Sequence, residues 1–160
     1  MSTKFIDLFA GIGGIRLAFE NAASKINKNV KCVFTSEWDK FANETYKSNF
    51  KDSFNISGDI TKIKSSNIPD HNLLLAGFPC QAFSQAGKKL GFKDTRGTLF
   101  FDIARILKDK KPDFFLLENV KQLVGHDKAS KKDKIGRTLD TILSILNDLN
   151  YNVNWKTLRA

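Results

Sequence analysis

The chain has 160 residues, of which 41% are hydrophobic and 27% are charged, and 26 Lys and Arg against 17 Asp and Glu give a formal net charge of +9. This length suits one domain with a sizeable core, and the absence of any apolar stretch near ~20 residues and of a leader pattern excludes a membrane protein and predicts a cytoplasmic one. The basic balance favours polyanionic partners such as nucleic acid, although a lysine-rich genome would produce the same balance.

Strand and helix patterns alternate along the chain. Strands are predicted at 4–9, 30–37, 56–60, 72–78, 113–119 and 151–158. Helices are predicted between them, at 15–22, 38–50, 99–107 and 135–146. The continuously apolar run at 72–78 and the segment 113–119 are typical of central parallel strands covered on both faces. This alternation predicts a doubly wound, mostly parallel α/β sheet, with loops at 79–97 and 125–134.

A glycine turn follows the first predicted strand. The letters FAGIGG place Gly11, Gly13 and Gly14 between a strand and a helix, where they allow a tight turn and the close approach of a ligand to the backbone. A dinucleotide-binding fingerprint would have its third glycine at position 16, which is Arg16 here. The turn therefore favours a nucleoside ligand without a pyrophosphate.

Suggestive side chains stand at the next two strand ends. Glu37 closes the second strand, where an acid would hold ribose hydroxyls, and Trp38 beside it would stack on an adenine. Asp59, near the third strand end, would accept a hydrogen bond from the adenine amino group. Each residue also has a plain structural explanation, as a neighbour of a helix N-cap, a core residue or a turn residue. Their occurrence at successive strand ends favours the nucleoside site.

The stretch LLLAGFPCQAFSQAG (73–87) leads from a buried strand into a proline-stiffened loop that carries Cys80. The two cysteines form neither a disulfide framework nor a metal-binding spacing, so both are expected to be reduced and no metal is expected. Cys32 is interpreted as a small buried hydrophobe. Cys80 is the candidate nucleophile, and Glu118 at the end of the next strand would be costly to bury without a partner. One reaction that suits this pair adds sulfur to C6 of a cytosine while the acid protonates N3.

Two lysine-rich segments follow the candidate nucleophile. The glycine-bounded segment 87–97 would close over phosphates, with a solvated surface loop as the alternative interpretation. The lysines of 128–134 are interpreted as solvated surface.

Taken together, these motifs resemble those of the C5-cytosine DNA methyltransferases of bacterial restriction–modification systems. FIDLFAGIGGIRLAFE resembles the family's first cofactor motif, and EWD and GDI resemble the second and third. GFPCQAFS resembles the nucleophile motif, and ENV (118–120) resembles the acid motif. Pro-Cys followed by Glu-Asn-Val in this order is highly specific, and the resemblance covers essentially the whole chain.

The resemblance implies a Rossmann-like fold, S-adenosylmethionine as the methyl donor, and a cytosine flipped out of duplex DNA as the substrate. It implies that Cys80 attacks C6 and that Glu118 holds N3 and the exocyclic amine. It implies DNA contacts by Ser84, Lys88, Lys89 and Arg96. It also implies a cofactor site lined by Phe9, Gly11, Ile12, Gly13, Glu37, Trp38, Asp59, Ile60, Pro79 and Leu99.

The resemblance is incomplete at the C-terminus. Family members present a Gln-x-Arg-x-Arg motif, a target-recognition domain and a closing segment beyond the point where this sequence ends in WKTLRA. Residues 1–160 are therefore expected to form an incomplete S-adenosylmethionine-binding catalytic domain that is inactive alone. The chain would be a fragment, a truncated gene product, or one half of a split enzyme with a separately encoded C-terminal half. Two alternatives stay open, a tRNA cytosine-5 methyltransferase and an inactive half that only binds nucleic acid.

Overall fold

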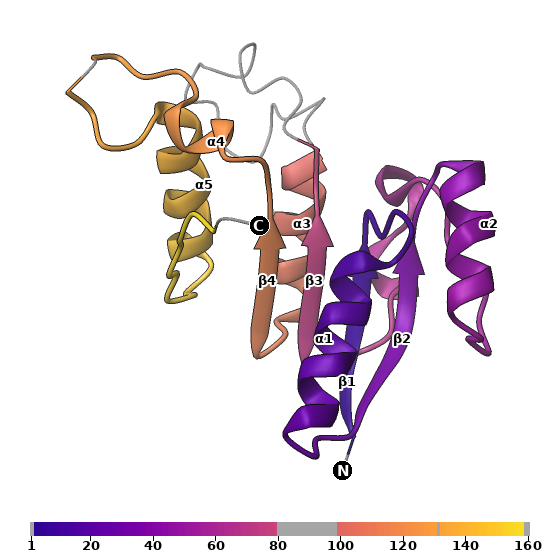
Figure 1. Cartoon of the computed structure of the whole chain (residues 1–160). Coiled ribbons are helices and arrows are strands. Elements are labelled where there is room, and N and C mark those ends of the chain that lie inside the picture. Colours follow the sequence, from indigo (N-terminus) through magenta and orange to yellow (C-terminus); the bar gives the residue numbers. More distant parts are fainter. Residues whose placement is uncertain (1, 80–98, 131, 159–160) are drawn as a thin grey trace. The chain divides into compact units, whose positions relative to one another are not determined.

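The computed structural model describes residues 2–79, 99–130 and 132–158 (Figure 1). The chain divides into two compact units, one formed by Met1–Phe78 and Arg105–Glu118 and the other by Pro79–Ala104 and Asn119–Ala160. Helix α3 (Leu99–Lys110) contributes residues to both units.

A four-stranded parallel sheet forms the centre of the first unit. Its order is β2-β1-β3-β4, with bounds Val30–Ser36, Thr3–Leu8, Leu73–Gly77 and Phe114–Glu118. The chain passes from β1 to one side through β2 and then to the other side through β3, so the strand order reverses at β1. Open α/β sheets bind their ligands outside the carboxyl ends of the strands at such a point. The predicted doubly wound, parallel α/β fold is confirmed.

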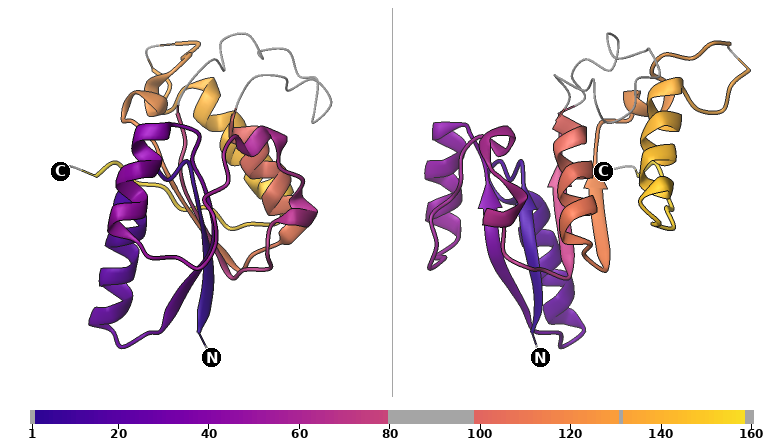
Figure 2. Two further views of the ribbon diagram at one scale, coloured as in Figure 1. Left: turned by 90° about the vertical axis from the view of Figure 1, so that its right-hand side faces the viewer. Right: turned by 180° about the vertical axis from the view of Figure 1, so that it is seen from behind.

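Helices cover both faces of this sheet. Helices α1 (Gly14–Lys25) and α2 (Lys40–Asn49) lie on one face, and the part of α3 that belongs to the first unit lies on the other (Figure 2). The two central strands are therefore covered on both sides, which explains the continuous apolar run of β3. Their fully buried side chains are Phe5, Ile6, Leu8, Leu74, Leu75 and Ala76.

The strand register aligns the carboxyl ends of all four strands. Pairing places one residue of each strand in a row across the sheet: Ser36, Leu8, Ala76 and Leu117. The residues that follow this row lie at one edge of the sheet: Glu37, Phe9, Gly77 and Glu118. Residues that lie 28 to 109 positions apart in the sequence are thus collected at a single edge, which we call the functional edge.

Two helices and their connection make up most of the described part of the second unit. The short helix α4 (Gln122–Gly125) packs against α5 (Arg137–Asp148). The buried residues of α5 recur at helical spacing, as expected for a helix with one apolar face: Thr138, Leu139, Ile142 and Leu146.

Three strand predictions are wrong within the described residues. Segment 56–60 makes one isolated bridge, Ser57 with Ser36, and then enters a 3-10 turn at Ile60–Lys62 because Asp59 caps that turn. Segment 151–158 forms no strand, since the described residues of its unit contain no strand for it to pair with. Strand β4 lies at the edge of the described sheet and not at its centre. The apolar pattern of β4 does not place it at the centre of the sheet, and its Phe114 and Leu116 are exposed.

Candidate active site

A strained glycine turn connects β1 to α1. Phe9, Gly11 and Gly13 have positive φ angles of 54°, 53° and 91°. A bulky residue such as Phe9 rarely adopts this conformation, which costs on the order of 1–3 kcal/mol and occurs preferentially at functional sites. A Cβ on Gly13 would overlap the Phe50 ring, so glycine is required there. The Gly13 N–H donates to the Ala10 carbonyl at 2.8 Å, and the predicted tight turn is confirmed.

Glu37 connects this turn to the end of β2. Its Oε2 accepts a hydrogen bond from the Gly11 N–H at 2.8 Å, and its Oε1 accepts one from the Asp39 N–H at 2.8 Å. Glu37 is only 8% exposed, and the two bonds fix its carboxylate at the functional edge. A carboxylate offers about four lone-pair sites, so each oxygen can accept one further bond. Trp38 beside it is 83% exposed, which leaves its ring accessible to a ligand.

Asp59 and Ile60 follow a segment that is held against the end of β2. The Ser36 hydroxyl donates to the Gly58 carbonyl at 2.7 Å. Asp59 Oδ1 accepts hydrogen bonds from the Thr61 hydroxyl and N–H at 2.7 and 3.0 Å, and these bonds lower the pKa of Asp59. Ile60 is buried in the core. Of the other predicted cofactor contacts, Ile12 is exposed in the glycine turn, whereas Pro79 and Leu99 belong to the second unit.

Glu118 ends β4 with its carboxylate over the end of β3. Gly77 pairs with Glu118, and a Cβ on Gly77 would lie 3.5 Å from Glu118 Oε2 and 3.0 Å from Ile15 Cδ1. Gly77 precedes Cys80 by three residues, so the carboxylate covers the strand that leads to the predicted nucleophile. Cys80 and the predicted DNA contacts lie outside the described residues, namely Ser84, Lys88, Lys89 and Arg96.

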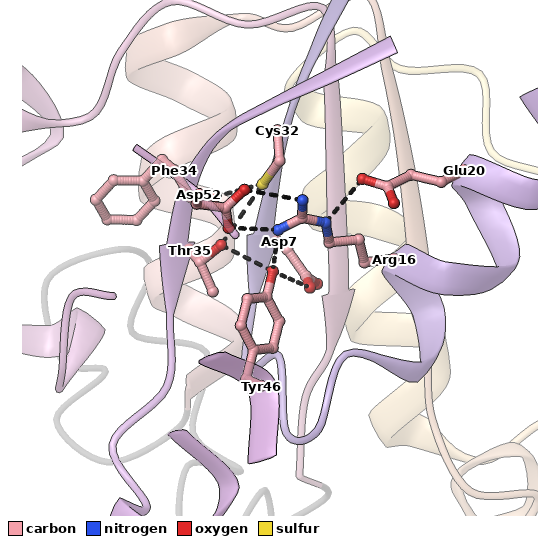
Figure 3. Close-up of polar contacts among 8 residues, drawn as sticks. All are labelled: Asp7, Arg16, Glu20, Cys32, Phe34, Thr35, Tyr46 and Asp52. Atoms are coloured by element: carbon pink, nitrogen blue, oxygen red, sulfur yellow. Dashed lines mark hydrogen bonds and ion pairs between the residues drawn. The ribbon is translucent and has the colours of Figure 1, made fainter. Parts of the chain in front are cut away.

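Sequence reasoning missed a buried polar cluster that links α1 to α2 (Figure 3). Arg16 is 6% exposed, and its two Nη atoms donate to the Asp52 carboxylate at 2.5 and 2.9 Å. Nη1 also donates to Tyr46 Oη at 2.8 Å, and Nε donates to Glu20 Oε1 at 2.8 Å. The guanidinium carbon lies 4.0 Å from the centroid of the Phe50 ring, the same ring that restricts Gly13. Arg16 therefore stabilises the turn from within the protein.

Burial controls the ionisation of two other residues in this cluster. Asp7 is 1% exposed, and desolvation raises its pKa to about 7, although Tyr46 Oη donates to Asp7 Oδ2 at 3.3 Å. Cys32 is 6% exposed and packs with Phe5 and Leu75, and burial raises the pKa of its thiol. Because the thiolate is the nucleophilic form, Cys32 is suited to packing and not to chemistry. The interpretation of Cys32 as a buried hydrophobe is confirmed.

The two histidines make local hydrogen bonds. His71 Nδ1 lies 2.8 Å from the Pro69 carbonyl oxygen, and His126 Nδ1 lies 2.7 Å from Thr138 Oγ1. Across the ranges 2–79, 99–130 and 132–158, no three His, Cys, Asp or Glu residues are grouped so that they could hold a metal ion. The same ranges contain no helix with the length and apolarity needed to span a bilayer.

The chain is similar to several proteins named as methyltransferases. It is 60% identical over 157 residues to the type II methyltransferase M.NlaIV of Neisseria lactamica, and 48% identical over 157 residues to M.HhaI of Haemophilus parahaemolyticus. These matches cover 98% of this chain but only 37% and 43% of the two relatives. A solved structure of a DNMT2 variant from Spodoptera frugiperda is similar with a TM-score of 0.64 at 25% identity, covering 93% of this chain and 42% of that one.

The family assignment agrees with the functional edge. The model of the C-5 cytosine-specific DNA methylase family matches residues 3–160, which include the glycine turn, Glu37 and Glu118. The chain spans less than half the length of the relatives named above. The chain belongs to the C-5 cytosine-specific DNA methylase family.

Proposed function

We propose that residues 1–160 form the S-adenosylmethionine-binding catalytic domain of a DNA (cytosine-5) methyltransferase that acts in a bacterial restriction–modification system. The observation that carries this proposal is the functional edge. Three residues come directly after members of one row of paired strand residues, and they therefore lie at the same edge of the sheet. They are Phe9 of the strained turn, Glu37 and Glu118. One edge therefore combines groups suited to a nucleoside with an acid suited to a cytosine.

The residues at the ends of β1 and β2 fit S-adenosylmethionine, which supplies an electrophilic methyl group. Glu37 has lone pairs left to accept hydrogen bonds from both ribose hydroxyls, and the exposed Trp38 ring can stack on the adenine. Asp59 would accept from the adenine amino group. Arg16 points into the buried cluster, so its side chain is not available to bind a phosphate at the turn. The remaining contacts of the site would be Phe9, Gly11, Ile12, Gly13, Ile60, Pro79 and Leu99.

Cys80 and Glu118 would activate the cytosine together. The Cys80 thiolate forms a bond to C6 while the Glu118 acid gives a proton to N3, and the displaced electron pair makes C5 nucleophilic. Glu118 also accepts a hydrogen bond from the exocyclic amine. Once C5 carries the methyl group, its proton is lost to a base, the C5–C6 double bond re-forms, the bond from C6 to Cys80 breaks, and the N3 proton returns to Glu118.

The substrate would be duplex DNA with the target base flipped out of the stack. Base extrusion costs a few kcal/mol, which contacts to the DNA must offset. We assign DNA contacts to Ser84, Lys88, Lys89 and Arg96, and the formal charge of +9 favours association with the phosphate backbone. Target recognition would come from a C-terminal portion, on the same polypeptide or separately encoded. The enzyme would act in the cytoplasm, on DNA of the nucleoid.

Methyl transfer tests this function directly. The chain, alone and combined with the C-terminal portion of the N. lactamica relative, is incubated with methyl-labelled S-adenosylmethionine and either duplex DNA or tRNA. We expect label in 5-methylcytosine of the DNA when the C-terminal portion is present, and none from the chain alone. Label in the tRNA alone would instead favour the tRNA alternative. No label in either substrate with the complete combination would contradict a methyltransferase function.

Replacing Glu37 by alanine is expected to weaken S-adenosylmethionine binding by about 1.5–3 kcal/mol, the range for a hydrogen bond to a charged group. This corresponds to roughly a 10- to 150-fold higher Kd. Isothermal titration calorimetry on the chain measures it. Asp39→Ala is the matched control, because this neighbouring carboxylate caps α2 through the Ala42 N–H at 2.7 Å and has no assigned ligand contact. Equal affinities for the parent and Glu37→Ala chains would contradict the ribose-binding role.

A further inference from the structure

A surface hollow of about 450 Å³ lies in the second unit, beside α4. None of its lining residues belongs to the functional edge or has a role in the function proposed above. The lining combines two lysines with an amide and a hydroxyl around a small apolar patch: Lys121, Gln122, Val124, Gly125, Lys128 and Thr157.

The two lysines make the hollow positively charged. A Cβ on Gly125 would lie 3.8 Å from Lys128 Cε, so the Lys128 side chain folds back over α4. In the described part of the chain, neither Lys121 nor Lys128 has an ion-pair partner. The neighbouring acid Asp127 is already bound by Arg137, with Oδ1–Nη2 and Oδ2–Nε distances of 2.7 and 3.0 Å. Two uncompensated ammonium groups therefore remain at the hollow.

The loop that carries Lys128 is held closed at its base. It is the segment between α4 and α5 in Figure 1. The Gly136 N–H donates to the Val124 carbonyl at 2.8 Å, and the Arg137 N–H donates to the Asp127 carbonyl at 3.2 Å. The His126 carbonyl occupies the space that a Cβ on Gly136 would need, so glycine permits this close approach. These contacts fix both ends of the loop. Lys128 therefore loses less conformational entropy on binding an anion than a lysine on an unrestrained loop would lose.

We propose that this hollow binds one backbone phosphate of the DNA strand that carries the target cytosine. The proposal rests on the function proposed above. Lys121 follows Glu118 by three residues, and a trans chain spans at most about 3.6 Å per residue, so their Cα atoms are within about 11 Å. A base held at Glu118 brings phosphates of its own strand within reach of a lysine side chain, because successive phosphates are only about 3.4 Å apart along the helix axis. Two ammonium groups, an amide and a hydroxyl are suitable donors for a phosphodiester.

The test is the salt dependence of DNA binding. Anisotropy of a labelled duplex is measured with the parent chain, with Lys121→Gln/Lys128→Gln, and with Lys25→Gln/Lys28→Gln. The last variant is the control, because it removes the same charge from exposed residues at the C-terminal end of α1 and just beyond it. The slope of log K against log salt is negative, and loss of one phosphate contact decreases its magnitude by about 0.9. We expect this decrease for Lys121→Gln/Lys128→Gln and an unchanged slope for the control.

The outcomes separate this proposal from the proposed function. Equal slopes for the two double variants, or no DNA binding by the parent chain, would overturn the phosphate site even if methyl transfer is observed. A slope of smaller magnitude for Lys121→Gln/Lys128→Gln alone, without methyl transfer, would keep the phosphate site and reject the function. Calorimetry with inorganic phosphate distinguishes a free anion from the DNA backbone. Binding of phosphate that is lost in Lys121→Gln/Lys128→Gln, with an unchanged DNA slope, would contradict our assignment.

Discussion

A covalent complex between protein and DNA is expected to accumulate when 5-fluorocytosine replaces the target cytosine, and Cys80→Ser is expected to abolish it. The proposed reaction ends with loss of the C5 proton, and fluorine at C5 cannot leave in that way. The bond from sulfur to C6 therefore persists. A serine hydroxyl cannot replace the thiol, because it is far less acidic and a weaker nucleophile. The complex is detected on a denaturing gel, with S-adenosylmethionine and the C-terminal portion of the N. lactamica relative present.

Two variants sharpen this experiment. Cys32→Ala should form the complex normally, because Cys32 is buried in the sheet and burial raises the pKa of its thiol. Glu118→Gln keeps the size of the side chain but has no acid proton for N3, and loss of a general acid slows a reaction by about 10²–10⁴-fold. A complex formed equally well by Cys80→Ser protein would show that another group is the nucleophile.

The functional edge could be predicted from the sequence because its signals are local. The glycine turn, the acid at the end of β2 and the acid at the end of β4 each follow a recognisable strand, and parallel strands bring their carboxyl ends together. The error at 56–60 has a local cause as well. The alternation of strands and helices predicts a strand there, but Asp59 accepts hydrogen bonds from the Thr61 N–H and hydroxyl, and the chain turns after a single bridge.

The Arg16 cluster could not be predicted in the same way. Its partners Tyr46 and Asp52 lie 30 and 36 residues away, so no spacing rule connects them to Arg16. In the sequence, Arg16 stands where the dinucleotide fingerprint has a glycine, which indicates only that a pyrophosphate site is absent. The structure shows that Arg16 also has a stabilising role. A buried guanidinium needs hydrogen-bond acceptors, and the acceptors of Arg16 connect α1 to α2 and to the segment after it.

This cluster connects the interior of the protein to the functional edge. Arg16 belongs to the helix that starts at the glycine turn, and Thr35 precedes Glu37 by two residues in the sequence. Tyr46 Oη joins them, since it lies 3.0 Å from Thr35 Oγ1 and accepts from Arg16. Asp7, two residues before the strained Phe9, accepts from the same hydroxyl. The charge on Asp7 therefore affects the stability of the structure that carries the turn.

Asp7 is expected to make the protein less stable as the pH rises from about 4 to about 7. Desolvation raises its pKa from the ordinary 3.8 to about 7 in the folded protein, opposed by Tyr46 and Arg16 and assisted by Glu20 and Glu37. Between these two values the unfolded chain releases the Asp7 proton and the folded chain keeps it, so deprotonation favours unfolding. At 1.36 kcal/mol for each pKa unit, the free energy of unfolding decreases by about 4 kcal/mol in total, and above pH 7 this decrease stays constant.

Asp7→Asn isolates this effect, because asparagine keeps an oxygen that accepts from Tyr46 but cannot ionise. The free energy of unfolding is measured by urea denaturation of both chains at several pH values from 4 to 8. The stability of Asp7→Asn relative to the parent should rise steadily up to about pH 7 and then level off, because only the parent pays the cost of a buried carboxylate. Carbon NMR of the Asp7 carboxyl locates its midpoint independently. A difference that does not change with pH, or a midpoint near 4, would show that Arg16 and Tyr46 outweigh burial and keep Asp7 ionised.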